Sequence, residues 1–214
     1  MRGKAGWRGL AEATVQGVLQ GKLTNSDLIS LNQTLWRLSN QREPELMMQA
    51  AKQYGHLQLQ EGHYTALIDG LLCTQRTVQA VYVFYQAQIY NVSLDCAILS
   101  DLLTALILAG AELVNVEFIW ERMAKESMTP PANVCSKLLL FCMEKGHWPL
   151  ATRVLAAMLK SDLELPHKLI TSILSRSKNS DKLQDFLQVW EQADEVRSPK
   201  RRRGLQFVLV LPRQ

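Results

Sequence analysis

The 214-residue sequence lacks the residue patterns on which most active sites and metal centres are built. Its four cysteines form no CxxC pair and its four histidines lie far apart, so no zinc-ligand spacing is present. It contains no GxxxxGK, HExxH or GxSxG. We therefore expect no enzyme activity, cofactor, metal or small-molecule substrate. We expect Cys135 and Cys142 to be buried as small apolar side chains.

Long apolar runs are also missing. No run approaches the roughly 18 residues that a membrane span requires, and the N-terminus has no compact apolar core of a signal peptide. With this cysteine usage, we predict a cytoplasmic protein with no membrane partner. Mitochondria stay an alternative because of the arginine-containing N-terminus, and the nucleus because a basic tail resembles an import signal. That tail contains Lys200, Arg201, Arg202 and Arg203.

What the sequence does contain is a repeat. Residues 64–95 and 135–166 align without a gap, and residues 99–131 align with both after one extra residue near Glu112. A period of about 35 residues is typical of stacked supersecondary units. In each unit, apolar residues at helical spacing precede and follow a turn, and Gly110 and Gly146 suit the ends of first helices. Each unit is therefore predicted to be a helical hairpin.

The flanking residues predict further hairpins. Thr24, Asn25 or Ser26 suits a helix start, Pro44 suits the first turn of a second helix, and Gly55 suits its end. A last hairpin is predicted after Pro166, with its second helix near residues 183–190. The predicted fold is all-α, a right-handed α-solenoid of about five hairpins. We divide the chain into a basic lead-in (1–23), a helical-repeat domain (24–193) and a basic tail with a short apolar end (194–214).

The first repeat resembles the pentatricopeptide repeat (PPR) family. It shares with the family pattern Tyr64, Leu67, Ile68, Asp69, Gly70, Leu71, Arg76, Ala80, Phe84 and Asp95. In RNA-binding members, the residue after the tyrosine and the last residue of the repeat together recognise one base. The resemblance implies the pairs Thr65 with Asp95, Ser100 with Pro131, and Ser136 with Pro166. Because proline has no hydrogen-bonding side chain, only the first pair fits. Gly62, Ala97 and Asn133 occupy the positions that would sandwich a base, and they fit poorly.

A second resemblance rests on the tract LMMQAAKQYGHLQLQEGHYTALIDGLL. This tract is similar to the helical region of PAZ-domain proteins of vertebrate germ cells. The resemblance implies a cytosolic role in spermatogenesis and germ-cell transcript control. It also implies that the chain is a piece or a short form of a larger protein.

Charge is unevenly distributed along the chain. Residues 1–11 and 196–214 carry nine of the 24 basic residues and no acid, which leaves 15 basic residues against 20 acids in residues 12–195. Because nucleic-acid affinity depends largely on phosphate neutralisation, this acidic body favours a protein partner. The predicted function is therefore a non-enzymatic module that scaffolds proteins, with direct binding of single-stranded RNA as the alternative.

The contact surface is predicted on the first helices of the repeats. Its residues are Thr65, Asp69, Asp95, Ser100, Asp101, Ser136 and Lys137. Asp69 and Asp101 also form the one carboxylate pair that acid–base or metal chemistry would use, although solvated acids are the interpretation we favour.

Overall fold

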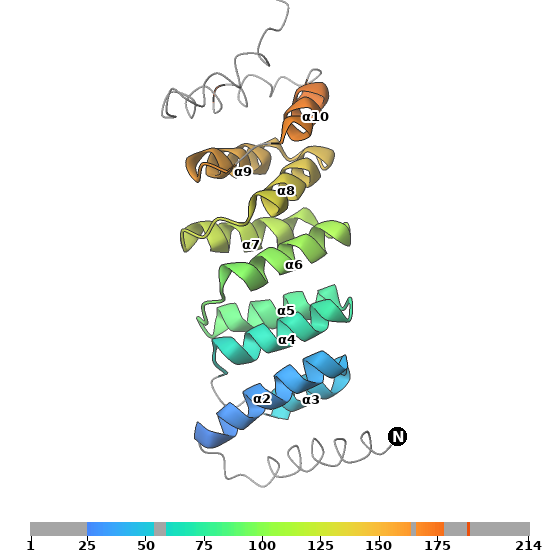
Figure 1. Ribbon diagram of the computed structural model, residues 1–214, viewed down its shortest axis with the longest axis vertical. Helices are drawn as coiled ribbons and strands as arrows, with labels where there is room; N and C mark the ends of the chain where they lie inside the picture. Colours follow the sequence, from blue (N-terminus) through green and yellow to red (C-terminus); the bar gives the residue numbers. More distant parts are fainter. Residues whose placement is uncertain (1–24, 54–58, 164–165, 178–187, 189–214) are drawn as a thin grey trace, which may run out of the picture. The chain divides into compact units, whose positions relative to one another are not determined.

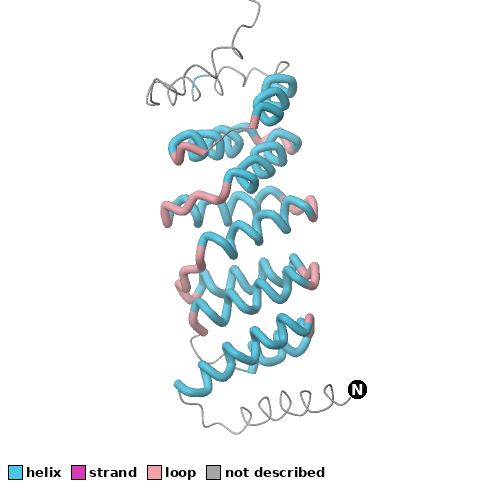
Figure 2. Tube along the Cα trace, in the orientation of Figure 1, coloured by secondary structure: helices cyan, strands magenta, loops and turns pink. Residues whose placement is uncertain are grey.

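The computed structural model describes residues 25–53, 59–163, 166–177 and 188, and within these ranges it contains helices and no strand (Figures 1 and 2). The all-α prediction is therefore confirmed for the described residues. The predicted turn at Gly55, the predicted helix near 183–190 and both terminal segments lie outside them. In chain order the helices are α2 Asn25–Gln41, α3 Pro44–Gln53, α4 Glu61–Cys73, α5 Thr77–Ile89, α6 Cys96–Leu108, α7 Leu113–Lys125, α8 Ala132–Glu144, α9 Trp148–Lys160 and α10 His167–Ser177.

The chain forms two compact units, residues 1–111 and residues 112–214. In the first unit, α4 packs against both α2 and α6, and α3 and α5 each pack against α4. In the second unit, α8 packs against α9 and α10. First helices thus neighbour first helices within each unit, which is the arrangement expected of stacked hairpins.

The repeat length follows the predicted register. First helices begin at residues 61, 96, 132 and 167, and second helices begin at 77, 113 and 148, so the interval is 35 or 36 residues. The loop between α6 and α7 has four residues, 109–112, whereas the loops at 74–76 and 145–147 have three. This loop accounts for the extra residue that the alignment placed near Glu112.

Each first helix up to α8 ends with one residue in the left-handed conformation. Gly110 and Gly146 adopt it with φ of 64° and 71°, as their positions predicted. Arg42 and Gln75 adopt the same conformation after α2 and α4, although the sequence did not indicate it. Between hairpins, the same conformation is adopted by Asn91, Ser127 and Asp162. In the first repeat, Arg76 N–H then donates to Leu71 O at 2.8 Å, and equivalent bonds close the other turns. These are Schellman caps, which satisfy the last helical carbonyls.

Two residues of α4 fix its distance from α2. His63 is buried, and its Nδ1 accepts from Gln60 N–H at 3.2 Å, so Nε2–H donates to Leu28 O at 2.8 Å. At Gly70, an added Cβ would lie 2.5 Å from Met47 Cε and 3.1 Å from Ser39 Cβ. The glycine shared with the PPR pattern therefore permits close helix approach.

The second unit combines an apolar core with an ion-pair cluster. Arg153 of α9 pairs with Glu117 and Glu121 of α7. Cys135 and Cys142 are buried as predicted, whereas Cys73 is exposed. Burial, followed by the nearby Glu117 carboxylate, raises the pKa of Cys142 to about 12. This thiol therefore stays protonated and behaves as a small apolar side chain.

The fold predicts a large cost for truncating Trp120, which is only 4% exposed. Trp120→Ala should lower the free energy of unfolding by about 3–5 kcal/mol, because it removes a large buried ring and leaves a cavity. Phe118→Ala on the same helix is the control. That ring is 39% exposed, so its loss should cost about 1 kcal/mol or less. Denaturant unfolding followed by circular dichroism measures both, and equal losses would contradict the prediction.

Candidate functional site

Successive first helices carry a small hydrogen-bonding side chain at one equivalent position. In α4, α6, α8 and α10 this position is the fifth residue of the helix. In α2 the position is counted from the other end: it lies ten residues before the left-handed Arg42, just as Thr65 lies ten residues before the left-handed Gln75. We call this set the polar row: Asn32, Thr65, Ser100, Ser136 and Thr171. The prediction from sequence contained its three middle members. Asn32 and Thr171 were missed because the flanking repeats align poorly. The helix start after Pro166 is the sequence signal that could have placed Thr171, whereas the left-handed Arg42 that places Asn32 has no such signal.

The serines of the polar row bond to their own helices. Ser136 Oγ donates to Ala132 O at 2.7 Å, and Ser100 Oγ donates to Cys96 O at 2.6 Å. Ser100 is only 3% exposed, so its predicted place on the contact surface needs correction: the helix packing covers it. Thr65 and Ser136 are half-buried. A hydroxyl that donates along the helix still offers an oxygen lone pair to a ligand.

Asn32 lies directly against α4. A Cβ on Gly62 would be 3.0 Å from Asn32 Nδ2, and Asn32 Oδ1 is buried without a hydrogen-bond partner. Gly62, which is a poor residue for sandwiching a base, therefore makes room for the amide of the neighbouring helix. An unpartnered buried acceptor is uncommon and favours a ligand or water that donates to it.

Three acids of the first unit interact near the polar row. Asp95 is exposed and caps α6, because its Oδ1 accepts from Ile98 N–H at 2.8 Å. Asp69 accepts from Ser39 Oγ at 3.1 Å. Burial raises the pKa of Asp101, and the negative charges of Asp69 and then Asp95 raise it further. The predicted Asp69–Asp101 pair therefore consists of interacting neighbours. Within the described residues, no group of three His, Cys, Asp or Glu has the arrangement of a metal site.

The remaining predicted residues are separate from this cluster. Lys137 is exposed on α8, at the position equivalent to Asp101 on α6. Pro131 is the N-cap residue of α8 and makes no side-chain cap bond, as its lack of a polar group requires. The basic tail residues Lys200, Arg201, Arg202 and Arg203 lie outside the described residues. Among the helices that the structure describes, none is long and apolar enough to cross a membrane.

Comparison with solved structures identifies the fold. The chain superposes on the PPR domain of Arabidopsis thaliana protein-only RNase P 1 (PRORP1), which was solved in complex with tRNA. The TM-score is 0.55 and the sequence identity is 15%, over 84% of this chain and 97% of that one. The chain therefore has a PPR-like helical-repeat fold. The fold class is thus an α-solenoid, as predicted, while the handedness of its superhelix stays a prediction. At this identity the likeness concerns the fold and carries no activity.

Other comparisons add little to this PPR-like assignment. The pentatricopeptide repeat protein PPR10 from maize gives a TM-score of 0.43 at 13% identity, over 90% of this chain and 27% of that one. No protein-family model and no curated protein matches the chain. The likeness to germ-cell PAZ-domain proteins therefore stays a prediction.

The raised pKa of Asp101 predicts a pH-dependent stability. Because the folded pKa exceeds the ordinary 3.8, stability is highest below the unfolded pKa and falls as pH rises through the folded pKa. Asp101→Asn removes this loss of stability because the amide does not ionise. At pH 7 the variant should therefore have a higher melting temperature than the parent. The difference should vanish below about pH 4, where the carboxyl is protonated in both states. A melting difference that does not change with pH would contradict an electrostatic cause.

Proposed function

We propose that this PPR-like chain binds single-stranded RNA through the polar row on its first helices, except for its buried member Ser100, which makes no contact. The observation that carries the proposal is the recurrence of a hydroxyl or amide at one register position, at Asn32, Thr65, Ser100, Ser136 and Thr171. Hydroxyl and amide groups suit the edges of unpaired bases, which both donate and accept hydrogen bonds. The likeness to a PPR domain that was crystallised with tRNA supports RNA as the ligand.

Thr65 and Asp95 form the most complete base-recognition pair under this proposal. Asp95 uses Oδ1 for the α6 cap, which leaves Oδ2 as an acceptor for a base N–H. Thr65 is half-buried on α4 and offers a hydroxyl. The repeat that ends in Pro166 retains only the Ser136 hydroxyl, and in the repeat that ends in Pro131 the Ser100 hydroxyl is buried. We therefore expect both repeats to discriminate bases less than the first.

The charges near the polar row predict how RNA affinity depends on salt concentration. Asp69, Asp95 and Asp101 repel phosphates, so contacts in the first unit gain little from counterion release. Affinity should therefore depend on base contacts and change only weakly with salt. The basic tail supplies phosphate contacts that are independent of sequence, and the two contributions separate experimentally.

The test uses the full chain with its tail neutralised, as K200Q, R201Q, R202Q and R203Q together. Fluorescence anisotropy against a pool of single-stranded RNA 12-mers should still show a preferred sequence. In that background, Thr65→Ala should weaken the preferred strand by roughly fivefold, the loss of about one hydrogen bond. Asp95→Asn keeps a cap oxygen while adding N–H donors, so it should change the preferred base rather than stability.

Thr74→Ala is the matched control for Thr65→Ala. Thr74 is also half-buried and donates to Gly70 O at 2.9 Å, at the far end of α4 and outside the polar row. Its loss should leave RNA affinity unchanged. If neutralising the tail abolishes binding, and if Thr65→Ala has no effect in the parent chain, RNA binding belongs to the tail and the proposal is wrong.

A further inference from the structure

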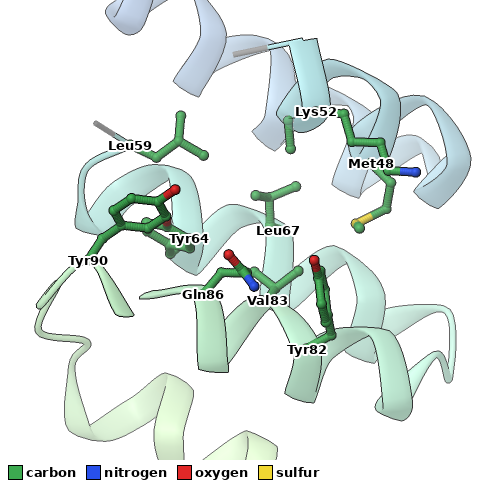
Figure 3. Close-up of a pocket in the computed structure, with 10 residues that line it drawn as sticks. Met48, Lys52, Leu59, Tyr64, Leu67, Tyr82, Val83, Gln86 and Tyr90 are labelled. Atoms are coloured by element: carbon green, nitrogen blue, oxygen red, sulfur yellow. The ribbon is translucent and has the colours of Figure 1, made fainter. Parts of the chain in front are cut away.

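A cavity of about 300 Å³ opens between α3, α4 and α5, on residues the polar row does not use. Its lining comes from the first unit alone. Leu67 of α4 lies between Met48 and Lys52 of α3 and the α5 residues Tyr82, Val83 and Gln86 (Figure 3). Tyr64 of α4 lies to one side, next to Tyr90, which follows α5 directly. This volume is at the lower end of the range for ligand sites and suits one large side chain.

The polar groups on the cavity wall have a common chemistry. Lys52 supplies an ammonium group, Gln86 an amide, and Tyr64, Tyr82 and Tyr90 supply phenols, so every one of them is able to donate a hydrogen bond. Among the described residues, no acid lines the cavity. Glu45 on α3 is ion-paired with Arg76, and within the described part of the chain Lys52 has no ion-pair partner. The wall is therefore complementary to an anion or a strong acceptor.

Tyr64 is the most buried tyrosine of the cavity wall. It is only 4% exposed, and burial followed by the Tyr90 phenol raises its pKa. A tyrosine in such a place combines an apolar ring with a hydroxyl that is able to donate to a ligand. Figure 3 shows its ring beside that of Tyr90 at one end of the cavity.

The apolar surface continues beyond the cavity along α5. Val78, Tyr82 and Ile89 are 85%, 58% and 68% exposed, and their spacing of four and seven residues places them on one helix face. The described helices thus leave an apolar stripe in water next to the cavity. A stripe of this kind is longer than one small ligand needs, and it is typical of a protein-interaction surface.

We propose that this cavity and the α5 stripe bind a partner protein through a segment with a large apolar side chain next to a carboxylate. The apolar side chain enters between Tyr82 and Tyr90 and covers Leu67 and Val83. The carboxylate accepts from Lys52 and from the phenols at the rim. Tyrosine-rich pockets of this composition are frequent hot spots of protein interfaces, because the rings bury large area at low entropy cost.

A nucleotide suits the site less well than this peptide. The floor is aliphatic, with Leu59, Leu67 and Val83, and a base would lose water from its polar edges there without compensation. One ammonium group also gives a phosphate backbone little affinity. The cavity and the α5 stripe therefore fit a protein partner better than a nucleic acid. This proposal is independent of the RNA proposal for the first helices.

The test titrates the full chain, observed by NMR, with a seven-residue peptide that has phenylalanine between two aspartates. Binding should be lost when alanine replaces the phenylalanine, and weakened when lysines replace the aspartates. Tyr82→Ala should reduce affinity by about fivefold or more. Lys52→Glu should reverse the preference, so that the lysine peptide binds better than the aspartate peptide.

Lys125→Glu on α7 is the charge-matched control, since Lys125 is exposed and lies outside the cavity. This variant should still prefer the aspartate peptide to the lysine peptide. Lys52 and Tyr82 are exposed, so melting temperatures should confirm that their variants fold. The proposal is overturned if no peptide binds, or if Lys52→Glu leaves the preference unchanged. It is overturned as well if the Tyr82-dependent ligand is an RNA 12-mer or, in sedimentation experiments, a second copy of the chain.

Discussion

The turn that closes each first helix up to α8 sets the register of the repeats that the structure describes. One left-handed residue and two backbone hydrogen bonds end the helices at Gln75, Gly110 and Gly146 and fix where the next helix begins. The residue that lies ten positions earlier then has the same place in each hairpin. A row of equivalent side chains therefore arises from backbone geometry, and any chemistry placed at that position is repeated along the chain.

Within the first unit, two surfaces with different chemistry share the same hairpins. The first helices carry hydroxyls, an amide and interacting acids, which suit the polar edges of bases. The described lining of the cavity between α3 and α5 is tyrosine-rich and contains Lys52 but no acid, which suits an acidic apolar segment. A repeat protein with both surfaces would bring a nucleic acid and a protein together, since neither proposed ligand uses the residues of the other.

Local signals were sufficient to predict the hairpins. Pro44 begins α3, Gly110 and Gly146 adopt positive φ, and the extra residue lies in the loop that ends at Glu112. Ser100 was predicted wrongly because its exposure depends on packing between helices, which periodicity does not report. The cavity was not predicted for a related reason: Lys52, Tyr64 and Tyr90 come from separate segments, and only their assembly places them on one cavity wall.

If the RNA proposal holds, Asp95 links folding and base recognition in one carboxylate. As the last residue of its repeat, it is also the N-cap of the next first helix, and Pro131 has the same double position before α8. Under the RNA proposal, a substitution at these sites changes both the base contact and the helix start. Base preference would then vary at low cost to the fold among Asp, Asn, Ser and Thr, the side chains that cap helices well. Proline suits a chain about to enter a helix but forms no side-chain hydrogen bond, so it keeps the fold without a base contact.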